Sequence, residues 1–88
     1  MEIIKNERET GLEGLEGIHT TFKFKNILYY LASDKIPGVE CKPYEVMLFD
    51  ISKDKSLADC VSYWRFDDML SMEEMHKYIL ENPEKYIK

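Results

Sequence analysis

Cys60 and His76 are the residues whose types most readily suggest covalent chemistry. A thiol acts as a nucleophile when a base lies within hydrogen-bonding reach and a third group orients that base. Cys60 lies in an aromatic run typical of a strand, and His76 lies in a segment typical of a helix. Packing of helix on strand could bring them together, so a small enzyme or ligand-binding domain using both residues is one alternative. No glycine motif typical of an oxyanion hole accompanies them, so we expect Cys60 to be packed in the sheet and His76 to lie on an exposed or half-exposed side of the helix.

Metal and acid chemistry also find little support in the spacing of the residues. Two histidines and two cysteines would suffice for zinc by number, but they show none of the short paired spacings of zinc motifs. Asp67 and Asp68 directly precede a helix, where acids commonly act as turn and cap residues. We therefore predict no catalytic residue, no metal and no cofactor. The four residues of the zinc tally are His19, Cys41, Cys60 and His76.

A group of aromatic residues with one arginine gives a more specific hypothesis, that of a protein-binding surface. The group consists of residues 63–66. Tyrosine, tryptophan and arginine are enriched where proteins bind one another, and here such a group directly precedes two acids. The alternative is ordinary core packing with a solvated arginine. If a single helix leaves one sheet face uncovered, Tyr30 and Tyr44 would be exposed with part of this group. The predicted protein-binding residues are Tyr30, Tyr63, Trp64, Arg65, Asp67 and Asp68.

Composition limits the class of protein. The 88 residues are enough for one modest core, and 44% hydrophobic with 12% aromatic content is too high for a disordered chain. A net charge of −5 argues against neutralising nucleic-acid phosphates. No apolar stretch approaches the roughly 20 residues of a membrane span, and the N-terminal residues lack the apolar centre of a secretory signal. We expect a cytoplasmic, acidic protein that binds neither membrane nor nucleic acid.

Two aromatic runs, 44–52 and 59–66, predict antiparallel strands because β-branched and aromatic residues cluster in them without a helix breaker. Residues 18–33 are ambiguous between a helix and a hairpin with a Lys25-Asn26 turn. The hairpin explains the alternation of residues 20–24 and would place Phe24 opposite Ile27, Phe22 opposite Tyr29, and Thr20 opposite Leu31. We favour the hairpin for that reason.

The ends of the chain give two further predictions. Ser71 and Glu74 form a capping-box pattern with Leu70 at the staple position before it, and Pro83 predicts that the helix ends near Glu81. Its buried stripe would contain residues 72, 75 and 79, with Leu80 as a further candidate. At the other end, residues 1–6 predict a short edge strand, and three glycines in 7–17 predict a loop.

Several of these segments together resemble small uncharacterised proteins of phages and prophages of gut-type Firmicutes. That family is similar in having a hairpin, a Tyr-Glu-x-Met-x-Phe strand, another strand and a helix that carries histidine, although Asn-Gly is usual at its turn, where this chain has Lys25-Asn26. The resemblance implies no activity, and it favours an accessory or host-interaction role. The segments that carry it are 22–24, 27–34, 44–49 and His76.

We predict a single α+β domain over residues 1–88, with residues 1–17 as a mobile N-terminal strand and loop. Its antiparallel sheet has four or five strands, and one C-terminal helix packs on one face. The expected function is non-enzymatic binding of another protein, by a phage or prophage accessory protein, through an acidic and aromatic surface. A structural homodimer joined through a sheet edge or face is the other alternative.

Overall fold

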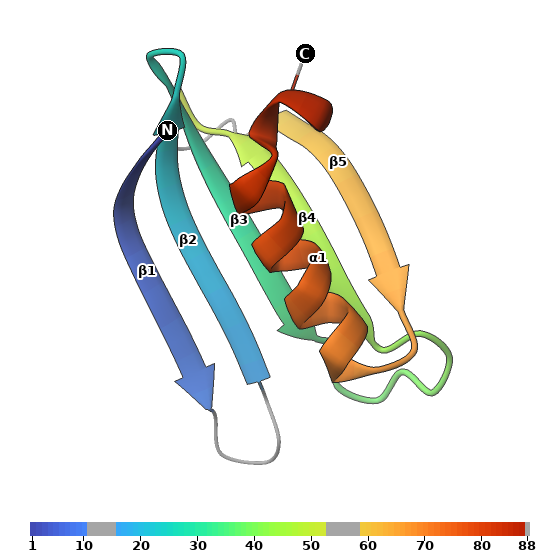
Figure 1. Ribbon diagram of the computed structural model, residues 1–88. Helices are drawn as coiled ribbons and strands as arrows, with labels where there is room; N and C mark the ends of the chain where they lie inside the picture. Colours follow the sequence, from blue (N-terminus) through green and yellow to red (C-terminus); the bar gives the residue numbers. More distant parts are fainter. Residues whose placement is uncertain (11–15, 53–58, 88) are drawn as a thin grey trace.

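The computed structural model describes residues 1–10, 16–52 and 59–87. They form an antiparallel five-stranded sheet in which each strand pairs with its neighbours in sequence, in the order β1-β2-β3-β4-β5 (Figure 1). The α+β prediction is confirmed, with five strands. The elements are β1 (Glu2–Thr10), β2 (Glu16–Phe24), β3 (Ile27–Lys35), β4 (Tyr44–Asp50), β5 (Asp59–Phe66), α1 (Met69–Glu81) and the short 3₁₀ helix η2 (Pro83–Lys85).

The β2–β3 hairpin confirms the predicted turn and register. Lys25 and Asn26 both have positive φ, 52° and 64°, as a two-residue turn requires to match the twist of the strands. Phe24 pairs with Ile27 and Phe22 with Tyr29. Alternation therefore places Phe22 and Tyr29 on the same face, where their rings stack with centroids 5.5 Å apart.

The N-terminal prediction was wrong in extent. The edge strand runs to Thr10 rather than to residue 6, and β2 begins at Glu16 within the segment predicted as a loop. Residues 11–15 of that predicted loop lie outside the described residues. The predicted mobility of residues 1–17 stays a prediction. Glycine is unfavourable in a helix but does not exclude a strand. In a strand it often marks a position where another group approaches the backbone closely. Gly17 is such a case, because it is buried beside the carboxylate of Asp34.

The two aromatic runs form β4 and β5 as predicted. β4 lies inside the sheet between β3 and β5. The register between β4 and β5 shifts near their ends, so that Leu48 faces Ser62 but Phe49 faces Cys60. Such a bulge leaves Val61 without a ladder partner and moves Cys60 out of alternation with Trp64.

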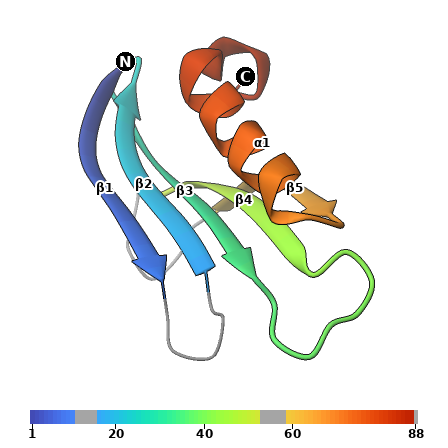
Figure 2. The ribbon, with the colours of Figure 1, turned by 60° about the horizontal axis from the view of Figure 1, so that its bottom comes forward.

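α1 packs on one face of the sheet, mainly over β3, β4 and β5 (Figure 2). We call this the helix face. Its buried apolar side chains come from the alternating positions of three strands and from one stripe of the helix, each stabilising the fold by about 1.5–3 kcal/mol on full burial. Tyr44 packs at the margin of this core, so its predicted place on the uncovered face was wrong. The core residues are Phe22, Tyr29, Leu31, Val46, Leu48, Met72 and Ile79.

The helix ends as predicted but begins earlier. Its cap is Asp68, whose Oδ1 accepts a hydrogen bond from the backbone N–H of Ser71 at 2.7 Å. Hydrogen bonds from Ser71 hold the pKa of Asp68 below its usual value. The predicted Ser71 cap is therefore wrong, as is the staple role of Leu70, which is 65% exposed. Asp68 and Ser71 are both residue types that suit an N-cap. The earlier start adds about one turn of helix over the sheet.

α1 has 13 residues. Within the described part of the chain, no helix has the length and apolar character needed to cross a membrane.

Replacing Asn26 with valine tests the turn. A β-branched residue at positive φ is strained, so we expect Asn26→Val to lower the free energy of unfolding by about 1–2 kcal/mol. Lys23→Val is the matched control, because Lys23 is exposed within a strand where valine is well tolerated. Urea unfolding measures both. Equal losses in the two variants would contradict the turn geometry.

Candidate functional site

The face of the sheet opposite α1 has no second layer among the described residues (Figures 1 and 2). We call it the open face. Strand alternation assigns its side chains, and Ala32, although on this face, is only 3% exposed because its neighbours pack around it. The residues that we use to define the open face are Gly17, His19, Tyr30, Ala32, Asp34, Glu45, Met47, Phe49, Tyr63 and Arg65.

An aromatic row crosses the middle of the open face. Tyr30 on β3 lies between His19 on β2 and Phe49 on β4, with ring centroids 5.7 and 6.5 Å away. All three side chains are half-buried, and Tyr63 on the edge strand β5 is 48% exposed. The row therefore presents ring surface across three adjacent strands without a described layer above it.

The six predicted binding residues do not form one surface. Tyr30, Tyr63 and Arg65 lie on the open face. Trp64 points the other way, to the helix face, where it is half-buried and its ring centroid lies 5.5 Å from that of Tyr86. Asp67 is exposed in the connection to the helix, next to the capping Asp68.

Polar groups hold the open-face side chains in place at one end. His19 Nε2 lies 2.7 Å from Asp34 Oδ1, and the hydroxyl of Tyr63 donates to Glu45 Oε2 at 2.8 Å. The hydrogen bond to Glu45 is the main cause of a raised pKa of Tyr63. Arg65 donates from Nε and Nη2 to the carbonyls of Lys42 and Cys41, at 2.8 and 3.2 Å. These bonds fix the orientation of the polar groups on the open face.

His76 is buried, and the expectation that it would lie on an exposed side of the helix was wrong. It is 3% exposed and lies in the buried stripe of α1 between Met72 and Ile79. Its Nε2 is 2.8 Å from Thr20 Oγ1, and its Nδ1 is 2.7 Å from Ser33 Oγ. Both hydroxyl groups belong to fully buried residues, so each ring nitrogen has a partner in place of water.

The donor and the acceptor of each hydrogen bond around His76 can be assigned. Thr20 donates its hydroxyl hydrogen to Asn6 Oδ1 at 2.8 Å, so it accepts from Nε2–H of His76, and Nδ1 accepts from Ser33. This assigns a neutral imidazole with its proton on Nε2. Burial, and secondarily the charge of His19, lower the pKa of His76 to about 4. The side chain is therefore neutral near neutral pH and a weak base.

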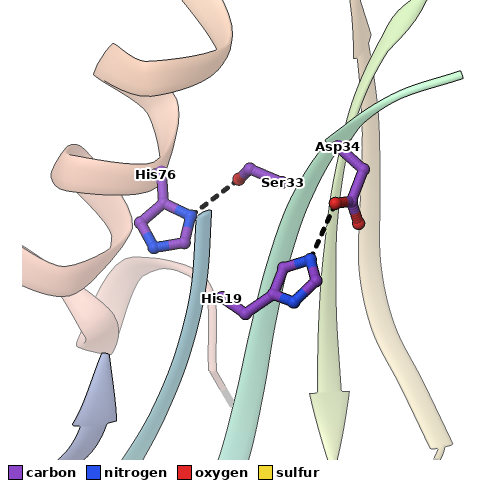
Figure 3. Close-up of polar contacts among 4 residues, drawn as sticks. All are labelled: His19, Ser33, Asp34 and His76. Atoms are coloured by element: carbon purple, nitrogen blue, oxygen red, sulfur yellow. Dashed lines mark hydrogen bonds and ion pairs between the residues drawn. The ribbon is translucent and has the colours of Figure 1, made fainter. Parts of the chain in front are cut away.

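The structure contains the residue types of a catalytic triad but divides them between two faces (Figure 3). Ser33 points to His76 on the helix face, while the next residue, Asp34, points to His19 on the open face. A triad needs a nucleophile, a base and an orienting carboxylate in one connected site that substrate can reach. Ser33 is fully buried, so the Ser33–His76 pair is closed to substrate.

The Cys60–His76 alternative is not supported by the arrangement. His76 bonds to residues on β2 and β3, whereas Cys60 lies on the edge strand β5, where its thiol donates to the carbonyl of Ser62 at 3.5 Å. Cys60 and Cys41 are both free and exposed, so the expectation that Cys60 packs in the sheet was wrong. Among the described residues, no group of three or more metal-ligating side chains is present.

The sequence analysis did not identify Thr20, Ser33 and Asp34 as partners of histidines, nor Asn6 as the acceptor for the Thr20 hydroxyl. One signal was available for the first two. Thr20 and Ser33 occupy alternating positions on the apolar face of the predicted hairpin, where a polar side chain needs a buried partner. His76 likewise follows Met72 by four residues and precedes Ile79 by three, the spacing of one helix face.

Comparisons of the chain with protein-family models, curated proteins and solved structures gave no match. The phage-type resemblance stays a prediction.

Burial of His76 predicts acid sensitivity. The neutral form is favoured in the folded chain, while in the unfolded chain His76 titrates near its ordinary pKa of 6.5. Its contribution is complete above that pKa and is lost as pH falls toward 4, by about 3 kcal/mol in all. His76→Gln keeps an amide that can bond both hydroxyls but does not titrate. Between neutral pH and pH 4, we expect the unmodified protein to lose more unfolding free energy than His76→Gln by about this amount. Urea unfolding of both proteins at each pH measures the difference. A constant difference from neutral pH to 4 would contradict the assignment.

The close approach of Gly17 to Asp34 predicts that substitutions at these two positions have non-additive effects on stability. A Cβ at Gly17 would collide with Oδ1 of Asp34 and displace it from His19. We expect Gly17→Ala to cost about 0.5–1 kcal/mol of unfolding free energy, and to cost less when Asp34→Ala has already removed the carboxylate. A smaller cost remains because the same Cβ would lie 3.3 Å from the carbonyl oxygen of Ser33. Urea unfolding of the two single variants and the double variant measures this. The same cost in both backgrounds would show that the carboxylate is not the cause.

Proposed function

We propose that this chain is a non-enzymatic interaction module that docks on a basic surface of another protein through the open face of its sheet. The observation that carries the proposal is the aromatic row of His19, Tyr30 and Phe49 on a face that no described element covers. Aromatic side chains on a rigid sheet supply large contact area at low entropic cost. The predicted residues Tyr30, Tyr63 and Arg65 belong to this surface.

Charge supports a basic partner. Asp34 and Glu45 lie directly opposite each other on β3 and β4, at one end of the aromatic row. Like charges in facing positions of a sheet are destabilising. Arg65, directly opposite Glu45 on β5, offsets part of that repulsion, and a cation from a partner would offset more. The net charge of −5 also speeds encounter with a basic surface. The partner that fits has lysine or arginine beside an apolar patch.

The resemblance to phage and prophage proteins supports an accessory role in this proposal, with a host or phage protein as the partner. Such a role needs binding without turnover. The closed Ser33–His76 pair and the separation of Cys60 from His76 are consistent with it.

Site-specific crosslinking tests the docking surface. A photoreactive phenylalanine analogue in place of Tyr63 should crosslink a partner in cells that make the protein. The same analogue in place of Tyr78 on the helix, which is 42% exposed against 48% for Tyr63, should not. The crosslinked partner is then identified by mass spectrometry and purified. Crosslinks from Tyr78 alone would contradict docking through the open face.

Affinity for that purified partner tests the charge. We expect Glu45→Gln and Tyr30→Ala each to weaken binding about tenfold or more, and Tyr78→Ala to leave it unchanged. Binding should also weaken as salt is raised, and by less for Glu45→Gln. Unchanged affinity in both open-face variants would contradict the proposal.

The β1 edge favours a homodimer as the second candidate. It is a nine-residue edge strand on which Ile3 and Ile4 are exposed, and an uncovered edge of this length can pair with a second copy. A mass that stays monomeric at all concentrations in light scattering would exclude this candidate, and a dimer broken by Ile4→Lys would support it.

A further inference from the structure

A shallow hollow of about 370 Å³ lies on the helix side of the sheet, between the end of β5 and α1. Its volume is within the range of about 300–1,000 Å³ that is usual for small-molecule sites. Because it lies on the side of the sheet opposite the open face, it is separate from the proposed docking surface. The residues that line it are Phe66, Ser71, Glu74, Met75 and Tyr78.

The apolar lining consists of two aromatic rings and a thioether. Phe66 and Met75 are half-buried and pack against the core. Tyr78 is 42% exposed, and its ring packs edge-to-face with that of Tyr86, with centroids 6.0 Å apart. Rings held by such contacts offer their negative faces with little further loss of entropy on binding.

Glu74 is the one charged residue of the lining. Its carboxylate has no hydrogen bond or ion pair with the part of the chain that the structure describes. The nearby Lys77 lies instead 4.0 Å from Glu81, one turn further along α1. The hollow therefore places a negative charge that no described residue neutralises beside two aromatic rings.

The ring of Tyr78 already contacts one cation. Lys85 Nζ lies 5.3 Å from the ring centroid and donates to the hydroxyl at 2.9 Å. Lys85 is not among the lining residues. The part of Tyr78 that borders the hollow therefore does not carry this contact.

We infer that this hollow binds a small free organic cation with a quaternary ammonium group, held against Phe66 and Tyr78 with Glu74 beside it. The carboxylate repels an anion, and a neutral ligand gains nothing from its charge. A primary ammonium has three N–H donors, whereas the lining offers one carboxylate. A quaternary ammonium has no donor to satisfy and is attracted by both the carboxylate and the ring faces.

Titration with choline against its neutral isostere, 3,3-dimethyl-1-butanol, tests the inference. The readout is the ¹³C-labelled methyl groups of methionine, since Met75 lines the hollow, whereas Met47 lies on the open face and Met72 in the core. Each compound is added up to about 50 mM at constant ionic strength, where millimolar affinity is visible. We expect a saturable shift of the Met75 methyl with choline only, and none at Met47 or Met72. Equal shifts with the isostere, or no saturable shift with choline, would overturn the inference.

Two related compounds test the nature and source of the cation. Ethanolamine is the primary-ammonium counterpart of choline, and we expect it to bind more weakly; equal affinity would overturn the preference for a quaternary group. Phosphocholine carries the same group as a lipid head group does, and Glu74 repels its phosphate, so it should also bind more weakly. Tighter binding of phosphocholine than of choline would assign the hollow to a lipid head group and overturn the free-cation assignment.

Three variants and a matched control locate the site. Glu74→Gln removes the charge and keeps the shape, so we expect choline affinity to fall about three- to fivefold. Tyr78→Leu removes a ring and should have a similar effect, whereas Tyr78→Phe keeps the ring and should retain the affinity. Glu81→Gln is the control, because Glu81 is an exposed glutamate of the same helix outside the hollow. A loss in Glu81→Gln equal to that in Glu74→Gln, or unchanged affinity in both Glu74→Gln and Tyr78→Leu, would overturn the site.

Discussion

One geometric constraint governs this fold, because a single helix is narrower than the sheet that it covers. Five strands about 4.8 Å apart span about 19 Å between their outer axes, whereas a helix with its side chains is about 10 Å across. α1 accordingly packs mainly over β3, β4 and β5. The apolar core lies beneath it, and one whole face of the sheet has no covering element among the described residues. The open face is uncovered because the one α-helix in the described part of the chain packs on the other side of the sheet.

The His76 network marks the flank of the helix where apolar packing gives way to polar groups. His76 extends from the buried stripe of α1 toward β2 and β3, and Thr20 continues the chain of hydrogen bonds to Asn6 on β1. Dispersion contacts tolerate small rotations of a helix, whereas hydrogen bonds have restricted angles. The network therefore sets the position of α1 on the sheet. Its cost is the burial of a titratable group, because desolvation disfavours the charged form of His76.

The sheet also explains why chemistry suggested by residue types does not assemble. Adjacent residues of a strand point to opposite faces, so Ser33 and Asp34 serve different histidines on different sides (Figure 3). The same alternation removes Trp64 from the aromatic group of Tyr63 and Arg65. The alternation does bring together, on the open face, a row of rings with carboxylates at one end.

Local physics determined much of the fold from the sequence alone. Period-two alternation and a turn that tolerates positive φ specify the β2–β3 register, and a proline specifies the end of α1, because each signal acts within a few residues. The start of α1 was locally ambiguous, since Asp68 and Ser71 both suit a cap. Only the tertiary structure decided the burial of His76, whose hydrogen-bond partners lie 43 and 56 residues away in the chain. It also decided which aromatic side chains share a face with the acids, because that depends on the pairing registers of β3, β4 and β5 and on where the one helix lies.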